Sequence, residues 1–354
     1  MRFLNKQVPP RHPHPRSQQG ITLIELMIAL VIGLLATGAM LKVYVDSSRL
    51  YRFNEGLARI QENGRFGLEF IRRDARMAGF WGCYRDADLT NRISTGSANY
   101  IDFDADDVTG TNDDSATIGE FITITDSITF SGASGGGLAV SSDMDLPSSP
   151  VSVSNLGNFQ TGDTLLISDC EMADIFQVTA TGGSTPILTL EHEEDGSDGS
   201  DANTSSELSK AYAAGSRLYP ARQITFCIAP GADPEQPSLR RLTNPASGET
   251  CQVDGDELVE GIENMQVLFG EDTNANDDGT NGDGTANRYL SFGDPELKMK
   301  RVVSVRIFLL ATSLNDNLTT EPSPYFFVEQ KPAPDDKRLR KAFTTTITLR
   351  NKGG

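Results

Sequence analysis

The sequence predicts an α+β protein in which a long N-terminal membrane-spanning α-helix packs, by its second half, on a globular domain rich in antiparallel β-sheet. Three observations predict this fold class. A predominantly apolar run extends from Ile21 to Leu41, an apolar repeat of three to four residues continues to about Ala78, and short alternating runs follow Gly79.

The run Ile21–Leu41 reads ITLIELMIALVIGLLATGAML. At about 1.5 Å per residue it would form a helix about 31 Å long, which matches a hydrocarbon core of about 30 Å. Residues 1–20 contain four basic residues and no acidic one. Because positively charged flanks stay in the cytoplasm, we expect a cytoplasmic N-terminus, a single pass through the inner membrane and a body beyond it.

Glu25 lies within this apolar run. A carboxylate at the centre of a membrane helix costs about 2.5–3.5 kcal/mol, and although a position near the end lowers the penalty, the group still requires a partner. An ordinary secretory signal would carry an A-x-A cleavage site after the apolar run, and none is present there. The polar-to-apolar change falls instead at Gly20-Ile21, so we expect the apolar helix to be retained.

The segment from Gly20 to Leu26, GITLIEL, resembles the class III signal of type IV prepilins and related pseudopilins. The resemblance implies that a prepilin peptidase removes residues 1–20 as a basic leader and methylates the new N-terminus at Ile21. It also implies that Glu25 pairs with the terminal amine of a neighbouring subunit. This pairing is physically reasonable because a carboxylate and an ammonium in a low dielectric relieve each other's desolvation, which favours assembly.

A helix-like pattern continues beyond the membrane segment, and no proline occurs before Pro147. We expect an N-terminal helix over residues 21–79, with its second half packed on the body, because its apolar positions recur on one face. These positions are Leu50, Leu57, Ile60, Leu68, Ile71 and Ala75.

Residues 80–354 are expected to form one β-rich domain, since short runs of strand-forming residues are separated by Gly, Ser, Asn and Asp. Period-2 alternation is clearest in two runs near the C-terminus, Val303–Leu309 and Phe343–Leu349, and is typical of a half-buried antiparallel sheet. Three long polar stretches, 132–150, 191–210 and 272–287, are expected to be exposed loops. The expected strands are Phe121–Phe130, Thr164–Ser168, Ile175–Ala180, Ile187–Leu190, Gln223–Ile228, Leu258–Phe269, Arg301–Thr312 and Phe343–Leu349.

The chain has four cysteines, Cys83, Cys170, Cys227 and Cys251, and no C-x-x-C pair. This spacing disfavours a zinc ribbon or a thioredoxin-type centre, and an even number in an exported body favours disulfides. Three pairings are possible. We prefer Cys227–Cys251, which would close a short loop between neighbouring strands, and by elimination Cys83–Cys170.

Four segments of the body carry a second resemblance, and they are Arg73–Cys83, Gly162–Cys170, Glu257–Glu263 and Arg350-Asn351. They resemble the PilW group of minor pilins. The resemblance implies a pilin-like fold and a protein that helps to initiate and build the type IV pilus, near its tip, with roles in twitching motility and adhesion. It implies other minor pilins, the major pilin, the prepilin peptidase and the inner-membrane assembly machinery as partners, and a lipid bilayer around the helix before assembly. Two of the segments end in a cysteine, which supports the Cys83–Cys170 pairing.

Two other functions are compatible with the same signal. One is a tip subunit whose acidic loops bind a surface, DNA or another cell, and the other is a pseudopilin of a type II secretion system. The net charge is −18, and loss of the four basic residues in 1–20 changes it to −22. A body this acidic disfavours nucleic acid as a partner. The large body and the PilW-like segments favour the pilus over the secretion system.

The sequence predicts neither an enzyme nor a bound cofactor. His12 and His14 lie in the leader, which leaves His192 in an acidic stretch, and there is no H-E-x-x-H, P-loop or G-x-S-x-G motif. One stretch beginning at Asp272 is rich in hard oxygen ligands and glycines, which suits calcium, although it is not an EF-hand. It gives a weak calcium candidate, whose ligands would be Asp272, Asn274, Asn276 and Asp278.

Overall fold

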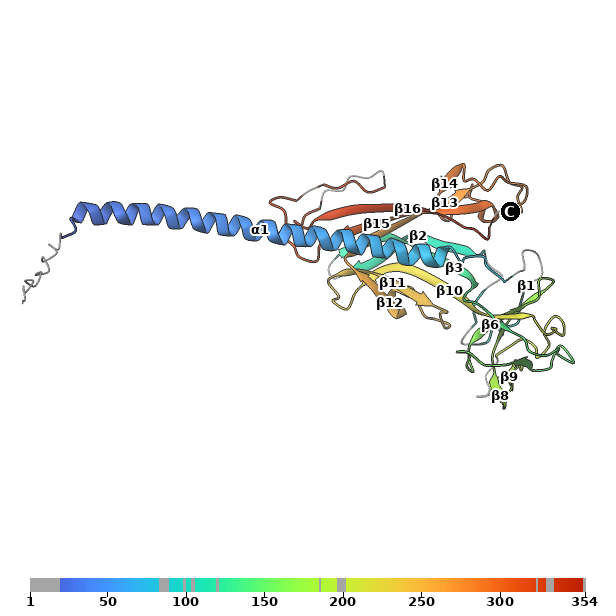
Figure 1. Ribbon diagram of the computed structural model, residues 1–354. Helices are drawn as coiled ribbons and strands as arrows, with labels where there is room; N and C mark the ends of the chain where they lie inside the picture. The colour runs from blue at the N-terminus through green and yellow to red at the C-terminus, as the bar shows by residue number, and fades with distance from the viewer. Residues whose placement is uncertain are drawn as a thin grey trace, which may run out of the picture. The chain divides into compact units, whose positions relative to one another are not determined.

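A long helix and a body of three β-sheets make up the computed structural model (Figure 1). It describes residues 20–82, 89–97, 100–102, 106–118, 121–184, 186–195, 202–322, 324–328 and 334–352. The chain divides into two compact units, of which the first ends at Phe53 and the second begins at Asn54. This division falls inside the helix, so the second part of the helix belongs to the same unit as the sheets.

The helix α1 (Leu23–Ala75) has 53 residues and forms as predicted, but its ends differ from the expected 21–79. It begins two residues later, after Thr22, and it ends at Ala75. Two 3₁₀-type hydrogen bonds follow, from Met77 N–H to Asp74 and from Ala78 N–H to Ala75. The chain then turns at Gly79, whose φ of +71° is a left-handed conformation that favours glycine.

The second part of α1 packs on the body along one stripe. The buried positions are spaced by three or four residues, which places them on one face of a helix. Ile60, Ile71 and Ala75 were predicted on this face and are buried, whereas Leu50, in the first unit, is 61% exposed. The stripe also includes two glycines that the apolar pattern did not mark. Its members are Ile60, Gly64, Gly67, Ile71 and Ala75.

The largest sheet has nine strands, six of which have the order β1-β7-β6-β10-β11-β12. Of the other three, β3 and β4 each pair with β10, and β2 pairs with β3. The central strand β10 is 14 residues long and pairs with β6 near its start and with β11 near its end. The strands are β1 (Leu89–Asn91), β2 (Val108–Ile118), β3 (Phe121–Ala133), β4 (Leu138–Ala139), β6 (Thr164–Ser168), β7 (Ala173–Gln177), β10 (Arg217–Pro230), β11 (Pro237–Thr243) and β12 (Asp256–Glu260).

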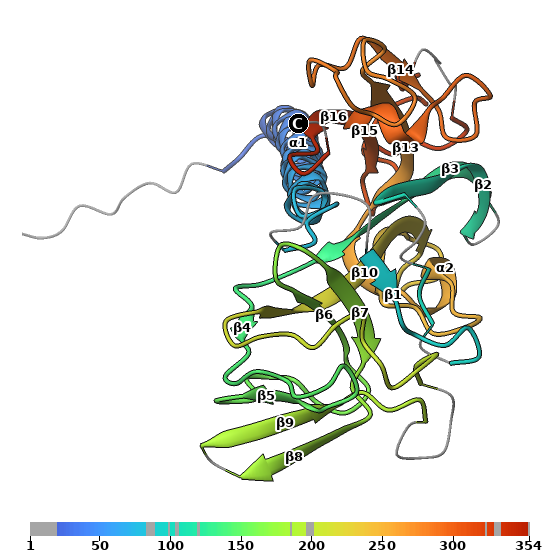
Figure 2. The same cartoon turned by 90° about the vertical axis from the view of Figure 1, so that its right-hand side faces the viewer.

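A second sheet is antiparallel, with the order β14-β13-β15-β16, and a third has the order β5-β9-β8. Figure 2 shows the second and third sheets at opposite ends of the body. The bounds are β13 (Ile262–Glu271), β14 (Arg288–Leu290), β15 (Val302–Thr312), β16 (Arg340–Thr348), β5 (Val151–Val153), β8 (Ala180–Ser184) and β9 (Ile187–Glu191). Two short helices complete the described elements, α2 (Cys251–Asp254) and the 3₁₀-helix η1 (Met299–Arg301).

Separate apolar cores fill the two halves of the body. In the first, Ile60 and Ile71 of α1 lie in one cluster with Ile307 of β15 and Phe226 of β10. In the second, side chains of β5, β6, β7 and β9 cluster around the buried Tyr212. Because β10 contributes to both cores, it connects the helix-bearing half to the half with the small sheet.

Each of the predicted strand segments contains strand, but two of them divide between different sheets. The expected Ile175–Ala180 covers the end of β7 and the first residue of β8. The expected Leu258–Phe269 becomes β12 and β13, which belong to different sheets. Gly261 separates them with a φ of +71°. Its N–H donates to Pro237 O at 2.7 Å, and its carbonyl accepts from Thr312 N at 2.8 Å, so this one residue bonds to both sheets.

The expectation that the polar stretches are exposed loops is wrong in part. Residues 132–150 and 191–210 place Val140, Met144 and Leu208 in the second core. His192 is also buried, with Nε2 3.0 Å from Ser149 O and its ring against Phe176. These segments are polar on average, and their average composition did not reveal the few apolar side chains that pack in the core.

Candidate functional site

The predicted processing site lies directly before the first turn of α1. Gly20, Ile21 and Thr22 have no helical structure, and Ile21 is 74% exposed. The Thr22 side chain caps the helix, because Oγ1 accepts from Glu25 N at 3.3 Å, and the Thr22 carbonyl accepts from Leu26 N at 3.1 Å. The helix therefore starts at Leu23, and the Gly20-Ile21 bond lies in the non-helical segment before it.

Glu25 is the third residue of α1 and occupies the position of the acid in an N-terminal capping box, T-x-x-E. A carboxylate in the first turn is stabilised by the unpaired N–H groups and the dipole at the helix start. Residues 26–41 of α1 are exposed and predominantly apolar, and the described helix is long and apolar enough to cross a membrane. The sequence thus combines a capped start, one acid and a membrane-length apolar surface.

At the other end of α1, the C-terminal residues of the chain hold the turn after the helix. Asn351 Nδ2 donates to Ala78 O at 3.0 Å, and Gly79 N–H donates to Ser131 O at 2.9 Å. Trp81 Nε1 donates to Asp107 Oδ1 at 2.8 Å. These contacts give a physical role to Gly79, Trp81 and Asn351, which the sequence marked only by resemblance.

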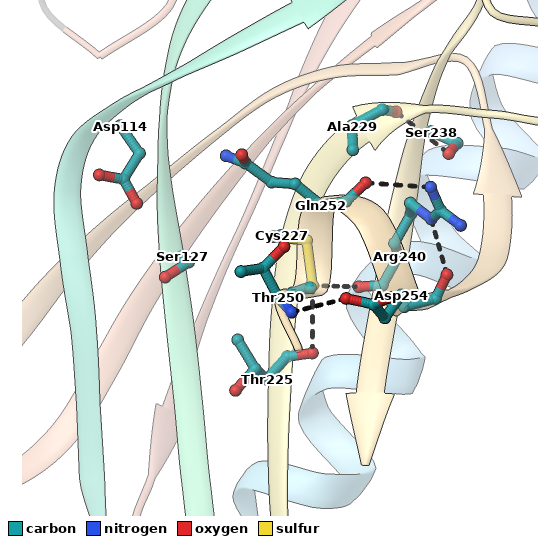
Figure 3. The surroundings of a disulfide bond; sticks show 12 residues. Asp114, Ser127, Thr225, Cys227, Ala229, Ser238, Arg240, Thr250, Gln252 and Asp254 are labelled. Carbon is teal, nitrogen blue, oxygen red and sulfur yellow. Dashed lines mark hydrogen bonds between the residues drawn. A yellow bond between two sulfur atoms is a disulfide. The ribbon is translucent and has the colours of Figure 1, made fainter. Parts of the chain in front are cut away.

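The predicted Cys227–Cys251 disulfide is confirmed (Figure 3). It joins β10 to the short helix α2 across a sequence separation of 24 residues. Arg240 of β11 secures the same turn, with Nε donating to Gly255 O at 2.8 Å and Nη1 donating to Gln252 O at 3.1 Å. The disulfide and the guanidinium together hold α2 against the sheet.

Cys83 lies outside the described residues, so its pairing with Cys170 stays a prediction. A peptide map of the unreduced protein tests it. A Cys83–Cys170 cross-linked peptide is expected, and a peptide that joins Cys83 to Cys227 or Cys251 would contradict it.

The weak calcium candidate forms a hydrogen-bonded loop. Asp272 is buried, and its carboxylate accepts the N–H groups of Asn274 at 2.9 Å and Gly284 at 2.8 Å. The side chains of Asn276 and Asp278 are likewise bonded to neighbouring loop groups. Within the described ranges, no three His, Cys, Asp or Glu side chains gather in a way that could hold a metal ion. Calcium binding stays a prediction, which calorimetry of the protein with millimolar calcium would test.

Comparisons with known proteins match two parts of the chain. Residues 15–41 match the prokaryotic N-terminal methylation motif, and residues 225–351 match the model of type IV pilus-assembly protein W. No curated protein matches significantly. A similar solved structure is a type IV-like pilin from Thermus thermophilus, at 14% identity and a TM-score of 0.24, covering 55% of this chain and 86% of that one.

The methylation motif and the long apolar helix before a β-rich body define the class of type IV pilin-like proteins. Within that class, the match over residues 225–351 supports a type IV minor pilin of the PilW type. The match begins in β10 and includes the confirmed disulfide, the second sheet and Asn351. The segments Arg73–Cys83 and Gly162–Cys170, which also carried the resemblance, lie outside it. The chain therefore has a role in type IV pilus assembly and fits a membrane-anchored pilin, a structural class whose members interact with other pilins.

Proposed function

We propose that this minor pilin is cleaved after Gly20, methylated at Ile21 and incorporated into the type IV pilus, where it helps to initiate assembly. The observation that carries the proposal is the start of α1. A non-helical, exposed Gly20-Ile21 bond precedes a capped apolar helix that holds Glu25 in its first turn. Glu25 would then pair with the terminal amine of a neighbouring subunit, since neither charge is stable alone in a low dielectric.

Before assembly the protein would be a single-pass protein of the inner membrane, with residues 1–20 in the cytoplasm and the body in the periplasm. The basic residues before the apolar run support this orientation. The prepilin peptidase would act there, and other minor pilins, the major pilin and the assembly machinery would receive the processed chain. A position near the tip follows from a role in initiation, because the first subunits assembled are the most distant from the membrane.

Intact-mass and N-terminal analysis of the protein from its native host, with and without the prepilin peptidase, tests the proposal. A mature chain that starts at methylated Ile21, depends on the peptidase and occurs in sheared pili is expected. Immunogold labelling of those pili should place the protein at their ends. An uncleaved chain confined to the inner membrane would overturn the proposal.

A further inference from the structure

The chain contains two Asn-Gly dipeptides, Asn63-Gly64 and Asn281-Gly282. In such a pair the main-chain nitrogen of the glycine can attack the side-chain amide carbon of the asparagine, because glycine has no Cβ that obstructs the approach. The reaction needs no enzyme. It does need a nitrogen that is not already bonded and an asparagine side chain that is free to turn, and the two pairs differ in both respects.

The first pair is held by the helix. Asn63 and Gly64 lie within α1, where the N–H of a residue bonds to the carbonyl four positions earlier. The Asn63 side chain is also fixed, because its Nδ2 donates to Glu260 O at 2.9 Å. The nitrogen of Gly64 cannot reach the amide carbon of Asn63 unless the helix opens at this point.

The second pair lies in the loop between β13 and β14, which spans residues 272–287 (Figure 1). Asn281 and Gly282 are both exposed and belong to no helix or strand. Among the described residues, none accepts a hydrogen bond from the Gly282 N–H. In the same ranges the Asn281 side chain makes only one long hydrogen bond, from Nδ2 to Oγ1 of the exposed Thr280 at 3.4 Å. The two groups that must react are therefore free to meet.

From this contrast we infer that Asn281 is a site of spontaneous deamidation. The Gly282 nitrogen loses its proton and bonds to Asn281 Cγ, and the side-chain amide leaves as ammonia, which closes a succinimide ring. Water then opens the ring at one of its two carbonyl carbons. Opening at Cγ gives aspartate, and opening at the main-chain carbon gives isoaspartate, in which Gly282 stays bonded to Cγ. The net reaction consumes one water, releases one ammonia and involves no oxidant.

The isoaspartate product opens the loop, because its main chain is one carbon longer directly before Gly282. A Cβ added at Gly282 would overlap Asp272 Oδ2 and would lie 2.9 Å from the Ala275 Cβ, so this residue already lies against two buried side chains. The longer chain displaces the Asp272 carboxylate, which holds the loop by accepting the N–H groups of Asn274 and Gly284. Loss of these two hydrogen bonds releases the loop from its closed form.

Both products also add a negative charge to a loop that already carries three exposed acids, Asp277, Asp278 and Asp283. Because exposed charges are screened by solvent and salt, this charge contributes little to the opening. The additional main-chain carbon is the cause, and an aspartate at position 281, which has the charge alone, separates the two effects.

Peptide mapping of the full-length protein in detergent tests the site. The folded protein is incubated in mildly alkaline buffer made with oxygen-18 water, digested in ordinary water and analysed by mass spectrometry. The peptide with Asn281 should replace its amide by a labelled oxygen, whereas the peptide with Asn63 should stay unchanged. In the urea-unfolded protein both pairs should react. An Asn281 that reacts only after unfolding, or equal rates of the two pairs in the folded protein, would overturn the inference.

Limited proteolysis tests the opening of the loop. After the incubation, proteinase K should cut the converted wild type within residues 272–287 at least about tenfold faster than the fresh protein, which corresponds to a shift of about 1.4 kcal/mol toward the open loop. Asn281→Gln, whose longer side chain disfavours the ring, should stay resistant after incubation. Freshly purified Asn281→Asp should also be resistant. Conversion without faster cleavage, or fast cleavage of fresh Asn281→Asp, would contradict the opening by isoaspartate.

Discussion

At the scale of single residues, the contact between α1 and the body depends on the absence of side chains. A Cβ added at Gly64 would lie 2.3 Å from the Phe343 ring, and one at Gly67 would lie 3.0 Å from Leu309. The sequence pattern marked Ile60 and Ile71 because they are apolar, and both are buried. It missed the glycines because a periodicity of apolar side chains cannot show where a helix must approach a sheet closely.

Replacement of Gly64 by alanine should therefore destabilise the body. Alanine favours a helix by about 1 kcal/mol over glycine, but overpacking against an aromatic ring costs about 1–3 kcal/mol, and we expect a net loss of up to about 2 kcal/mol. Urea unfolding of the full-length protein in detergent, followed by the fluorescence of the single tryptophan, Trp81, measures it. The double variant with Phe343→Leu should lose less than the sum of the two single variants. Strict additivity would show that the two residues do not clash.

A second residue-scale feature is the buried carboxylate of Asp126, at the crossing of β3 and β13. It accepts the N–H groups of Asp113 at 3.0 Å and Val267 at 2.7 Å. Burial raises the pKa of Asp126 to about 6, despite these two hydrogen bonds. Because its pKa in the unfolded chain is near 3.8, the native state binds a proton more readily than the unfolded state between those values.

This difference predicts that acidification stabilises the fold through Asp126. The contribution of Asp126 to the free energy of unfolding should rise by on the order of 2 kcal/mol as the pH falls from 7 to about 4.5, since protonation is linked to folding. Asp126→Asn removes the titrating group and should reduce this rise, as measured by urea unfolding at each pH. Equal pH dependence in the variant and the wild type would contradict the assignment.

At the scale of elements, alternation predicted strands well and connections poorly. In β15, Val303, Val305, Ile307 and Leu309 are all buried, as the period-2 pattern predicted. The run 258–269 was expected as one strand, but it divides between two sheets at Gly261. That division depends on the positive φ of Gly261 and on hydrogen bonds to residues distant in the sequence.

Gly261→Ala should weaken the junction between these two sheets. Alanine at a φ of +71° is strained, and its Cβ would lie 2.8 Å from Thr312 O. We expect a loss of about 2–4 kcal/mol, in the upper range for single substitutions. Gly284→Ala is the matched control, because its φ is +72° but its Cβ meets no atom within 4 Å. Equal losses of unfolding free energy in the two variants would show that the positive φ, and not the contact with Thr312, causes the destabilisation.

The candidate sites also differ in how far the sequence alone indicates them. The processing site stays a prediction, and the sequence suggests it because Gly20, Ile21 and Glu25 are close together and match a local motif. The contact that holds the turn after α1 could not be predicted, since Ala78 and Asn351 are 273 positions apart and only the fold brings them into hydrogen-bond contact. Local motifs are therefore readable from the sequence, whereas assembled surfaces are not.

At the scale of the whole molecule, the two compact units differ in how far their side chains are buried. The described residues of the first unit are almost all exposed, including the large apolar side chains from Ile21 to Val45, and so these residues have no core of their own. The second unit contains the apolar clusters and the confirmed disulfide. Assembly and folding should thus be separable by mutation.

Glu25→Ala tests this separation. The variant should still be cleaved after Gly20, and its body should unfold at the same urea concentration as the wild type. Its amount in sheared pili should fall by at least about tenfold, because loss of one partner from a buried ion pair costs about 3–5 kcal/mol. Glu62→Ala, the same change at an exposed position of α1 in the second unit, is the control and should assemble normally. Normal incorporation of Glu25→Ala would show that the intramembrane carboxylate does not drive assembly, and a shifted unfolding midpoint would show that the two units are coupled.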